Sequence, residues 1–472
     1  MSALSARRVP TPGASEKPLK IKVFRQERRD LDVREKGRAI QGNESTHGGS
    51  SQDGTVDDPN RALRPYPAAS RPRRIEIRRG GSESPPPRAT IAATVTLSTS
   101  FELVARPADL ARAIVRWRGA PVLAIDTEFV RERTFFPRLG LIQVGDGTLA
   151  TLIDPVAVGD LSPLSEVLDA PGTLKVIHSA SQDLEIFFRA LGRFPQPILD
   201  TQEAAALAGV GAGLGFGRLV SERLGVELAK GETRTDWMAR PLTEAQLTYA
   251  AADVVYLLPL YESLRAELEA QGRWEWALED SAALLEATFD EDPEEAYRRI
   301  KGAGRFERRG LAAVHALAAW REREARRRDL PRNMVLKEEL LLELAKRLPK
   351  EPAELGKIPG AHPGLIARDG ERWLAILREV AALPESALPP LVERKKPAPA
   401  VDALEEKLRQ HVRQRAAEIG LAPEVLASRR PLTALSRSVE SAEPPHLPRE
   451  LLGWRQAVIG EELLALARAA RS

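Results

Sequence analysis

The sequence predicts an α/β domain with a mixed sheet, followed by two all-α helical-bundle domains and preceded by a disordered extension. Three observations predict this organisation. Apolar strands and helical segments alternate between residues 96 and 290, the pattern is helical beyond about residue 289, and residues 1–95 are basic and rich in Pro, Gly and Ser. The 472 residues, 43% of them hydrophobic, are enough for about three domains of ~100–200 residues.

Residues 1–95 differ from the rest of the chain in charge and composition. They hold 19 Lys and Arg against 11 Asp and Glu, a net charge of +8, whereas the whole chain carries +3. Without apolar periodicity this segment cannot offset its ordering entropy by burial, so we interpret it as a disordered basic extension. It either remains solvated or holds RNA by charge. A third interpretation is that translation starts near Val95.

The domain at 96–290 begins near Ser98 with short apolar strands. The expected strands are 122–125, 141–144, 150–153, 175–178 and 197–199. Gly145, Asp146 and Gly147 are typical of a hairpin turn. Strands joined by tight turns and followed by alternating helices and strands predict a mixed sheet covered by helices.

The helices of this domain are predicted from their periodicity and their start signals. They are expected at 161–168, from Ser181 onward, at 201–208, at 216–224 and over 243–270. Ser181 is the expected N-cap of its helix, and Thr243 with Gln246 resembles a capping box.

The rest of the chain divides into two helical blocks, 298–382 and 401–472. The linker between them, 383–400, contains five Pro and the run Arg394-Lys395-Lys396. Each block has one Trp-Arg pair on a helix, Trp320-Arg321 and Trp454-Arg455. We expect two similar small bundles.

The composition restricts the chemistry that the protein can perform. There is no Cys, which excludes disulfides and thiolate sites, and there are only six His. A metal site would consist mainly of carboxylates, which hard cations such as Mg²⁺ or Mn²⁺ prefer. No apolar run reaches the ~18 residues of a membrane span, so we expect a cytoplasmic protein.

Two carboxylates follow the strand predicted at 122–125. In a strand, residues i and i+2 point to the same side, so Asp126 and Glu128 project together. Acids held this close repel each other, and a divalent cation would relieve the repulsion. By itself, this pattern is more often a solvated strand end.

Three further residues have the types and spacing of a metal site. Asp183 lies in the first turn of a helix, where the helix dipole alone would favour an acid. Tyr249 and Asp253 share one helix face, as a Tyr at the core edge and a surface Asp also would. A phenol beside such a carboxylate can orient a water molecule next to a metal held by the Asp.

The order Asp-x-Glu, Asp, Tyr-x-x-x-Asp resembles the DEDD superfamily of 3′→5′ exonucleases, in its tyrosine branch. The other branch has a His five residues before the last Asp, and position 248 here is Thr. Longer motifs resemble the ribonuclease D family. They are AIDTEFV at 124–130, LGLIQV at 139–144, HSASQDLE at 178–185, DTQ at 200–202, TRTDWMARPLT at 233–243 and YAAADV at 249–254.

This resemblance implies a ribonuclease H-like exonuclease domain at 96–290 and HRDC-like helical domains at 298–382 and 401–472. The implied catalytic residues are Asp126, Glu128, Asp183, Tyr249 and Asp253. The four acids would hold two divalent metal ions, Mg²⁺ or Mn²⁺, and Tyr249 would position the attacking water. Nucleoside 5′-monophosphates would be released from the 3′ ends of tRNA precursors and other structured RNAs, with no membrane and no obligate protein partner involved.

Two other functions remain open at this stage. The tyrosine branch includes DNA 3′→5′ exonucleases, although no polymerase or helicase motif accompanies this one. A non-catalytic RNA-binding scaffold would use the helical domains alone, but the complete set of acids argues against it.

Basic residues outside the acid set are candidates for contact with RNA. Residues 298–332 hold 12 Lys and Arg against 4 Asp and Glu, and such a stretch can supply the cationic contacts that an acidic site lacks. The alternative is a solvated helix face or, for the 233–243 block, salt bridges that stabilise a loop. The candidates are Arg234, Trp237, Arg240, Arg305, Arg326, Arg327 and Arg328. His178, at a strand end, is expected to have a structural role.

Overall fold

The computed structural model describes residues 100–228, 231–232, 234–391 and 398–471. The extension predicted at 1–95 and part of the predicted linker at 383–400 lie outside these residues. The described residues belong to one compact unit of the chain, 91–472.

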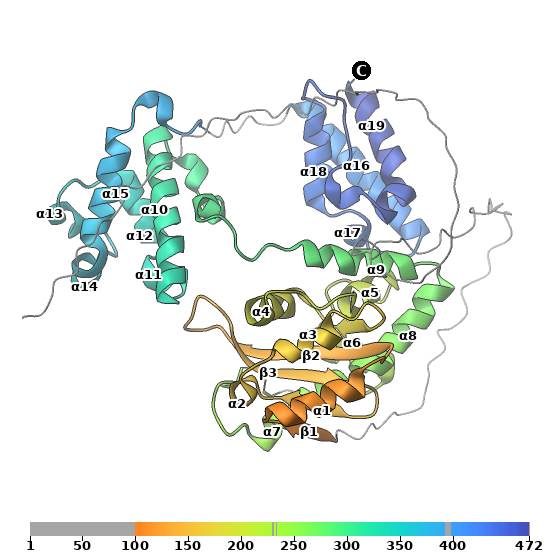
Figure 1. Ribbon diagram of the computed structural model, residues 1–472. Coiled ribbons are helices and arrows are strands. Elements are labelled where there is room, and N and C mark those ends of the chain that lie inside the picture. Colours follow the sequence, from red (N-terminus) through yellow and green to blue (C-terminus); the bar gives the residue numbers. More distant parts are fainter. Residues whose placement is uncertain (1–99, 229–230, 233, 392–397, 472) are drawn as a thin grey trace, which may run out of the picture. The chain divides into compact units, whose positions relative to one another are not determined.

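The α/β domain is organised around a mixed sheet of six strands in the order β1-β4-β3-β2-β5-β6. Strands β1, β2 and β3 are labelled in Figure 1. The strands are β1 Phe101–Val104, β2 Val122–Val130, β3 Arg138–Gly145, β4 Ala150–Ile153, β5 Leu174–Ile177 and β6 Ile198–Asp200. The β2–β3 and β3–β4 pairs are antiparallel, and the other pairs are parallel. The prediction of a mixed sheet is therefore confirmed.

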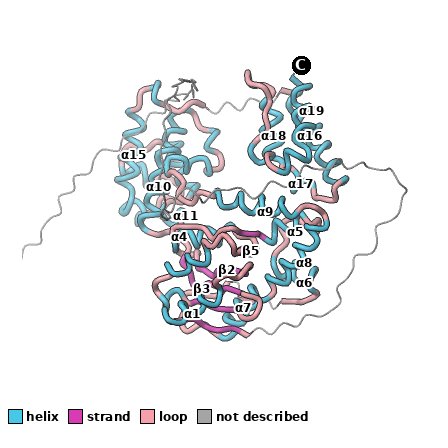
Figure 2. Tube along the Cα trace, turned by 45° about the vertical axis from the view of Figure 1, so that its right-hand side comes forward, coloured by secondary structure: helices cyan, strands magenta, loops and turns pink. Residues whose placement is uncertain are grey.

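Helices pack on both faces of this sheet (Figure 2). They are α1 Pro107–Trp117, α2 Pro155–Val158, α3 Ser165–Leu168, α4 Ser181–Leu191, α5 Thr201–Leu207, α6 Phe216–Leu224, α7 Glu244–Val255, α8 Leu257–Ala270 and α9 Trp274–Ala283, with short 3₁₀ turns at Ser162–Leu164 and Leu284–Glu286. Leu123 and Ile125 of β2 face the core beneath α1, α3 and α4, whereas Ala124 faces the core beneath α5, α7 and α8. Alternate residues of β2 therefore belong to opposite faces.

Strand β2 is longer than predicted. It pairs with β3 as far as Val130, with a register irregularity between Glu128 and Phe129. The acids Asp126 and Glu128 therefore lie within a hydrogen-bonded strand and not beyond its end. Strand β1 and helix α1 were not predicted.

The predicted cap of α4 is wrong. Ser181 is the first residue of the helix, and the N-cap position is Ala180, which makes no side-chain cap. Instead, the Asp200 carboxylate at the end of β6 accepts hydrogen bonds from the amides of Ser179 (2.9 Å) and Ala180 (2.8 Å). The cap comes from a neighbouring strand, and a local rule cannot detect it.

The single helix predicted over 243–270 is two helices, α7 and α8, which meet at Tyr256. Pro259 in the first turn of α8 has no N–H to bond the carbonyl four residues earlier, which accounts for the break. The capping box is confirmed, because Thr243 and Gln246 exchange reciprocal backbone–side-chain hydrogen bonds of 3.0 and 3.2 Å.

The C-terminal half forms two helical blocks with a similar order of elements. The first contains η3 Pro293–Arg299, η4 Ala303–Arg305, α10 Arg308–Arg328, α11 Arg332–Val335, α12 Glu338–Arg347, α13 Pro352–Leu355, α14 Pro363–Leu365, η5 Ile366–Gly370, α15 Glu371–Ala382 and η6 Glu385–Ala387. The second contains α16 Pro399–Glu418, α17 Pro423–Leu426, α18 Arg429–Ser438, η7 Arg449–Leu451, η8 Gln456–Gly460 and α19 Glu461–Arg471. In both, a long first helix is followed by short ones, and a π-helical turn ending in Gly leads into the last helix.

The Trp-Arg pairs are not equivalent in the two blocks. Trp320 lies inside the long helix α10, whereas Trp454 lies two residues before the start of the π-helical turn η8. The shared feature is the glycine that ends each π turn. A Cβ on Gly370 would lie 3.0 Å from Ile366, and one on Gly460 would lie 2.8 Å from Leu447.

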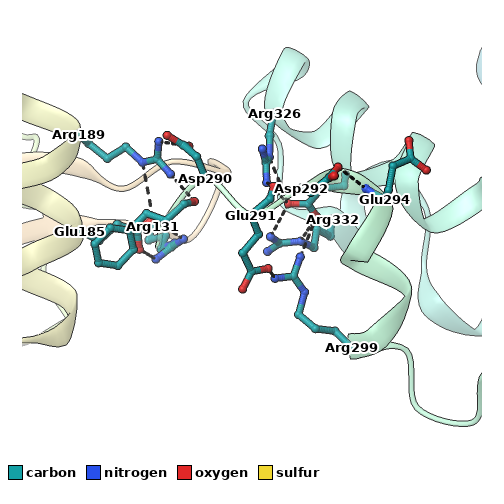
Figure 3. Close-up of polar contacts among 12 residues, drawn as sticks. Arg131, Glu185, Arg189, Asp290, Glu291, Asp292, Glu294, Arg299, Arg326 and Arg332 are labelled. Carbon is teal, nitrogen blue, oxygen red and sulfur yellow. Dashed lines mark hydrogen bonds and ion pairs between the residues drawn. The ribbon is translucent and has the colours of Figure 1, made fainter. Parts of the chain in front are cut away.

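The segment between α9 and α10 is held by ion pairs along its length (Figure 3). Near the sheet domain, Arg189 pairs with Asp290 at 2.6 Å. Further along the chain, Arg299 pairs with Glu291, whose carbonyl accepts a hydrogen bond from Arg326 at 2.7 Å. The Asp329 carboxylate also accepts hydrogen bonds from the amides of Phe135 and Phe136, at 3.0 Å each.

Candidate active site

Strand β2 delivers two of the candidate acids to one face of the sheet. Asp126 and Glu128 share the face of Ala124, which packs in the core that includes α7. Thr127 points to the opposite face, where α4 packs. Strand β2 therefore contributes side chains to the candidate site from both faces of the sheet.

Helix α7 brings Asp253 to this pair. One carboxylate oxygen each from Asp126, Glu128 and Asp253 lies within 4.8 Å of the other two. The helix approaches the sheet closely because β3 has glycine at position 145. A Cβ there would lie 2.9 Å from the carbonyl oxygen of Val254.

Asp183 reaches the site from the first turn of α4. It is 6% exposed, and its carboxylate accepts a hydrogen bond of 2.5 Å from the Thr127 hydroxyl. The residue between the two β2 acids therefore ties the fourth acid to the strand.

The four carboxyl groups form one electrostatic cluster. Burial, reinforced by repulsion from Asp183, Asp253 and Glu128, raises the pKa of Asp126 well above its ordinary value. Burial and the neighbouring acids raise the pKa of Glu128 to about 9 and that of Asp253 to about 7. The pKa of Asp183 is raised to about 7, mainly by burial and against the hydrogen bond from Thr127. All four acids predicted from the sequence are thus brought together.

This arrangement fits divalent cations. Buried acids that repel each other are costly to ionise unless a positive charge lies between them. Three oxygens within 4.8 Å, with a fourth acid linked through Thr127, form an all-oxygen donor set, which hard cations such as Mg²⁺ and Mn²⁺ prefer.

Tyr249 lies one helical turn before Asp253 on α7. It is half-buried, and its ring centre is 6.2 Å from that of Trp237. Residues four apart share a helix face, so the phenol lies on the side of α7 that carries Asp253.

Two of the predicted RNA contacts are corrected by the structure. Trp237 is 1% exposed and belongs to the core. Arg240 pairs with Asp154 at 2.7 and 2.9 Å and donates to the Gly140 carbonyl at 2.8 Å. These residues fasten the segment before α7 to β3, so the alternative of structural salt bridges is correct for Arg240. Arg234 is exposed.

The arginines of the first helical block also divide into two groups. Arg328 pairs with Asp369 at 2.6 Å, and Arg326 pairs with the buried Glu322 at 3.1 Å, so both arginines have structural partners and are mostly covered. Arg305 is exposed, and Arg327 is 67% exposed beside Glu324. These two remain available to a ligand.

His178 and Asp200 support the site without belonging to the acid cluster. His178 Nδ1 lies 3.0 Å from the Thr201 hydroxyl, and burial lowers the pKa of the imidazole, which agrees with the expected structural role. Asp200 was missed as a positioning group, although it lies in the motif at 200–202. Its long-range cap of α4 sets the turn that carries Asp183.

The fold and the acid cluster define a 3′→5′ exonuclease with a helical C-terminal half. The family model described as 3′-5′ exonuclease matches residues 101–269. The HRDC domain model matches residues 310–377, within the first helical block.

Whole-chain comparisons identify the family. The chain is 43% identical to ribonuclease D of Pseudomonas paraeruginosa over 358 residues, which are 76% of this chain and 95% of the relative. It is 39% identical to ribonuclease D of Escherichia coli over 367 residues, 77% of this chain and 97% of the relative. The chain belongs to the ribonuclease D family.

A solved structure agrees with this assignment. The crystal structure of Escherichia coli RNase D, described as an exoribonuclease involved in structured RNA processing, matches with a TM-score of 0.72 and 38% identity. The match covers 78% of this chain and 99% of that protein. Within the described residues, none of the helices has the length and apolar character needed to cross a membrane.

Proposed function

We propose that this protein removes nucleotides from the 3′ ends of structured RNAs, such as tRNA precursors, and releases nucleoside 5′-monophosphates. The carrying observation is the cluster of four acids on β2, α4 and α7, of which Asp183 is buried and the other three are half-buried. The likeness to the Escherichia coli enzyme, which acts in structured RNA processing, supports the choice of substrate.

The four acids are proposed to hold two divalent ions. Asp126 would contribute to both ions, Glu128 and Asp253 to one of them, and Asp183 to the other. When bound, two such ions supply a nucleophile near neutral pH and stabilise charge on the attacking and leaving oxygens. The closeness of Asp126, Glu128 and Asp253, and the separate approach of Asp183 through Thr127, support this division.

Tyr249 is proposed to orient the attacking water. Its place one turn before Asp253 puts the phenol beside the two acids assigned to the nucleophile-side ion. A hydroxyl held by a helix can fix the direction of attack without itself losing a proton, because an ordinary phenol has a pKa of ~10.

Phosphate contacts outside the acid cluster are proposed for exposed arginines. Arg234 lies in the segment before α7, and Arg305 and Arg327 lie in the first helical block. A polyanion must approach a site with four acids, so cationic surface nearby lowers the cost of binding.

Incubation with matched oligomers tests the proposal. Single-stranded RNA and DNA of one sequence, each with and without Mg²⁺, are followed by chromatography of the products. We expect mononucleotides from RNA only when Mg²⁺ is present. Faster degradation of DNA would favour the alternative of a DNA exonuclease, and binding of RNA without any product would favour a scaffold.

A further inference from the structure

A buried glutamine lies next to the acid cluster and was not assigned a role. Gln143 of β3 is 0% exposed. Neither its amide nitrogen nor its amide oxygen has a hydrogen-bond partner among the described residues. Leaving buried polar groups unpaired destabilises a protein, so such a residue calls for a functional explanation.

The register of the sheet places Gln143 directly opposite Asp126. The two residues are partners in the antiparallel β2–β3 pair. Partners of this kind project from the same face with Cβ atoms about 4.5–5.5 Å apart. Gln143 therefore lies beside Asp126, on the face that packs against α7.

Glu128 lies diagonally across β2 from Gln143 on this face, and the nearest neighbours of Gln143 other than Asp126 are apolar. Its partner on β4 is Leu152, and the residues two before and two after it on β3 are Leu141 and Gly145. Asp126 is thus the only one of these four neighbours with a polar side chain. The unpaired amide of Gln143 therefore lies beside the carboxylate of Asp126, which must be oriented to hold metal.

We propose that Gln143 is a positioning residue, whose amide nitrogen donates a hydrogen bond to the ionised Asp126 carboxylate and fixes it in the orientation that holds metal. This inference rests on the proposed function, in which Asp126 contributes to both ions. Groups that hydrogen-bond a metal-binding carboxylate orient it and increase its basicity. The amide would thereby gain the partner that it lacks.

Gln143→Met tests the proposal, because it keeps the length of the side chain and removes both polar groups. The measurement is Mn²⁺ binding by calorimetry in the absence of RNA. We expect binding about 10–100-fold weaker than in the wild type. We also expect a metal-free thermal midpoint that is unchanged or higher, because two unpaired polar groups are lost. A purely structural glutamine would leave the Mn²⁺ affinity unaltered.

Leu152→Met is the matched control. It introduces the same side chain on the other side of Gln143, in an equally buried position. It should retain wild-type Mn²⁺ affinity, because a volume-conserving change leaves the amide in place. An equal loss of affinity in both variants would attribute the effect to repacking and overturn the proposal.

A double variant tests whether Gln143 acts through Asp126. In the Asp126→Asn background, Gln143→Met should cause little further loss of Mn²⁺ affinity; an undiminished further loss would overturn the proposal. If Gln143→Met does not fold, Gln143→Leu replaces it, since it also removes the amide and should lose the same affinity. Wild-type Mn²⁺ affinity in this replacement variant, if it folds, would also overturn the proposal.

None of these measurements involves RNA. A protein that fails to degrade RNA would therefore contradict the proposed function and leave this test of Gln143 intact.

Discussion

Single side chains at the acid cluster carry the most direct prediction. Asp126→Asn or Asp253→Asn removes a proposed metal ligand with little change of shape. We expect turnover of RNA to fall by well over tenfold, because metal ions contribute several kcal/mol to such a reaction. Loss of one repelling charge should raise the thermal midpoint of the metal-free protein.

The control for these variants is Glu262→Gln, an exposed residue on α8. It should alter neither turnover nor the thermal midpoint. More than about a tenth of wild-type turnover in either Asp variant would contradict the site assignment, since the expected loss of several kcal/mol is far larger.

The pH dependence of stability belongs to the same acids. Asp183 and Asp253 have a pKa raised to about 7, and Glu128 has a pKa raised to about 9. Between the ordinary pKa values of these acids and their raised values, the folded, metal-free protein therefore binds more protons than the unfolded chain. Its stability falls as the pH rises through this interval. We expect the metal-free thermal midpoint to decline by several degrees between about pH 5 and pH 9. Mg²⁺ should restore the midpoint most at the high end of this pH range.

Asp126→Asn provides the comparison for this titration. It should flatten the decline, because one of the interacting charges is gone. A metal-free midpoint that rose with pH would show that the acids are not coupled in this way.

Tyr249→Phe separates orientation of the water from binding. Removal of the hydroxyl should lower the single-turnover rate, while the dissociation constant for RNA stays close to the wild-type value. Filter binding and rapid-quench assays measure the two quantities. An unchanged rate would remove Tyr249 from the mechanism.

At the scale of elements, the close approach of α7 to β3 makes Gly145 a sensitive position. A Cβ at position 145 would lie 2.9 Å from the Val254 carbonyl, next to Asp253. Gly145→Ala should therefore destabilise the protein by about 1–3 kcal/mol through overpacking. It should also weaken Mn²⁺ binding, because α7 must move away from β2.

Gly217→Ala is the matched control within a helix. Nothing lies within 4 Å of a Cβ at this position of α6, so the change should be neutral or stabilise by up to about 1 kcal/mol. Denaturant unfolding of both variants measures the difference. Equal stability of the two would contradict the steric role of Gly145.

Sequence alone could predict the elements whose information is local. The first part of β2, the turn at 145–147 and the capping box of α7 follow from periodicity and spacing. The extension of β2 through Asp126 and Glu128 depends on its pairing with β3. Long-range partners could not be predicted in this way. The cap of α4 comes from Asp200, although local rules predicted Ser181. Arg240 pairs with Asp154, and the sequence left a salt bridge and RNA contact equally open for it.

At the scale of the whole molecule, the second helical block shares a hydrophobic core with the exonuclease domain. Trp454 stacks on Trp276 of α9 with ring centres 4.5 Å apart, and Arg455 pairs with Asp280 at 2.5 Å. Removal of this block would expose Trp276, so a truncation confounds the loss of RNA contacts with the loss of packing. Charge substitutions in the full chain are therefore the better test of RNA binding.

The double variant Arg305→Gln, Arg327→Gln removes two exposed positive charges from the first helical block. Each phosphate contact releases counterions, so its loss should reduce the slope of log affinity against log salt by about 0.7–0.9. We expect weaker binding of a tRNA precursor and a slope smaller by up to about twice that amount. Turnover on a short RNA, which reaches only the acid cluster, should change little.

Arg347→Gln is the control for this double variant. Arg347 lies on α12, is paired with Glu343 at 2.8 Å and is outside the proposed contacts, so its loss should leave the salt slope unaltered. A double variant with the wild-type slope on the tRNA precursor would mean that these arginines do not contact RNA, and that the cationic surface for the substrate lies elsewhere in the chain.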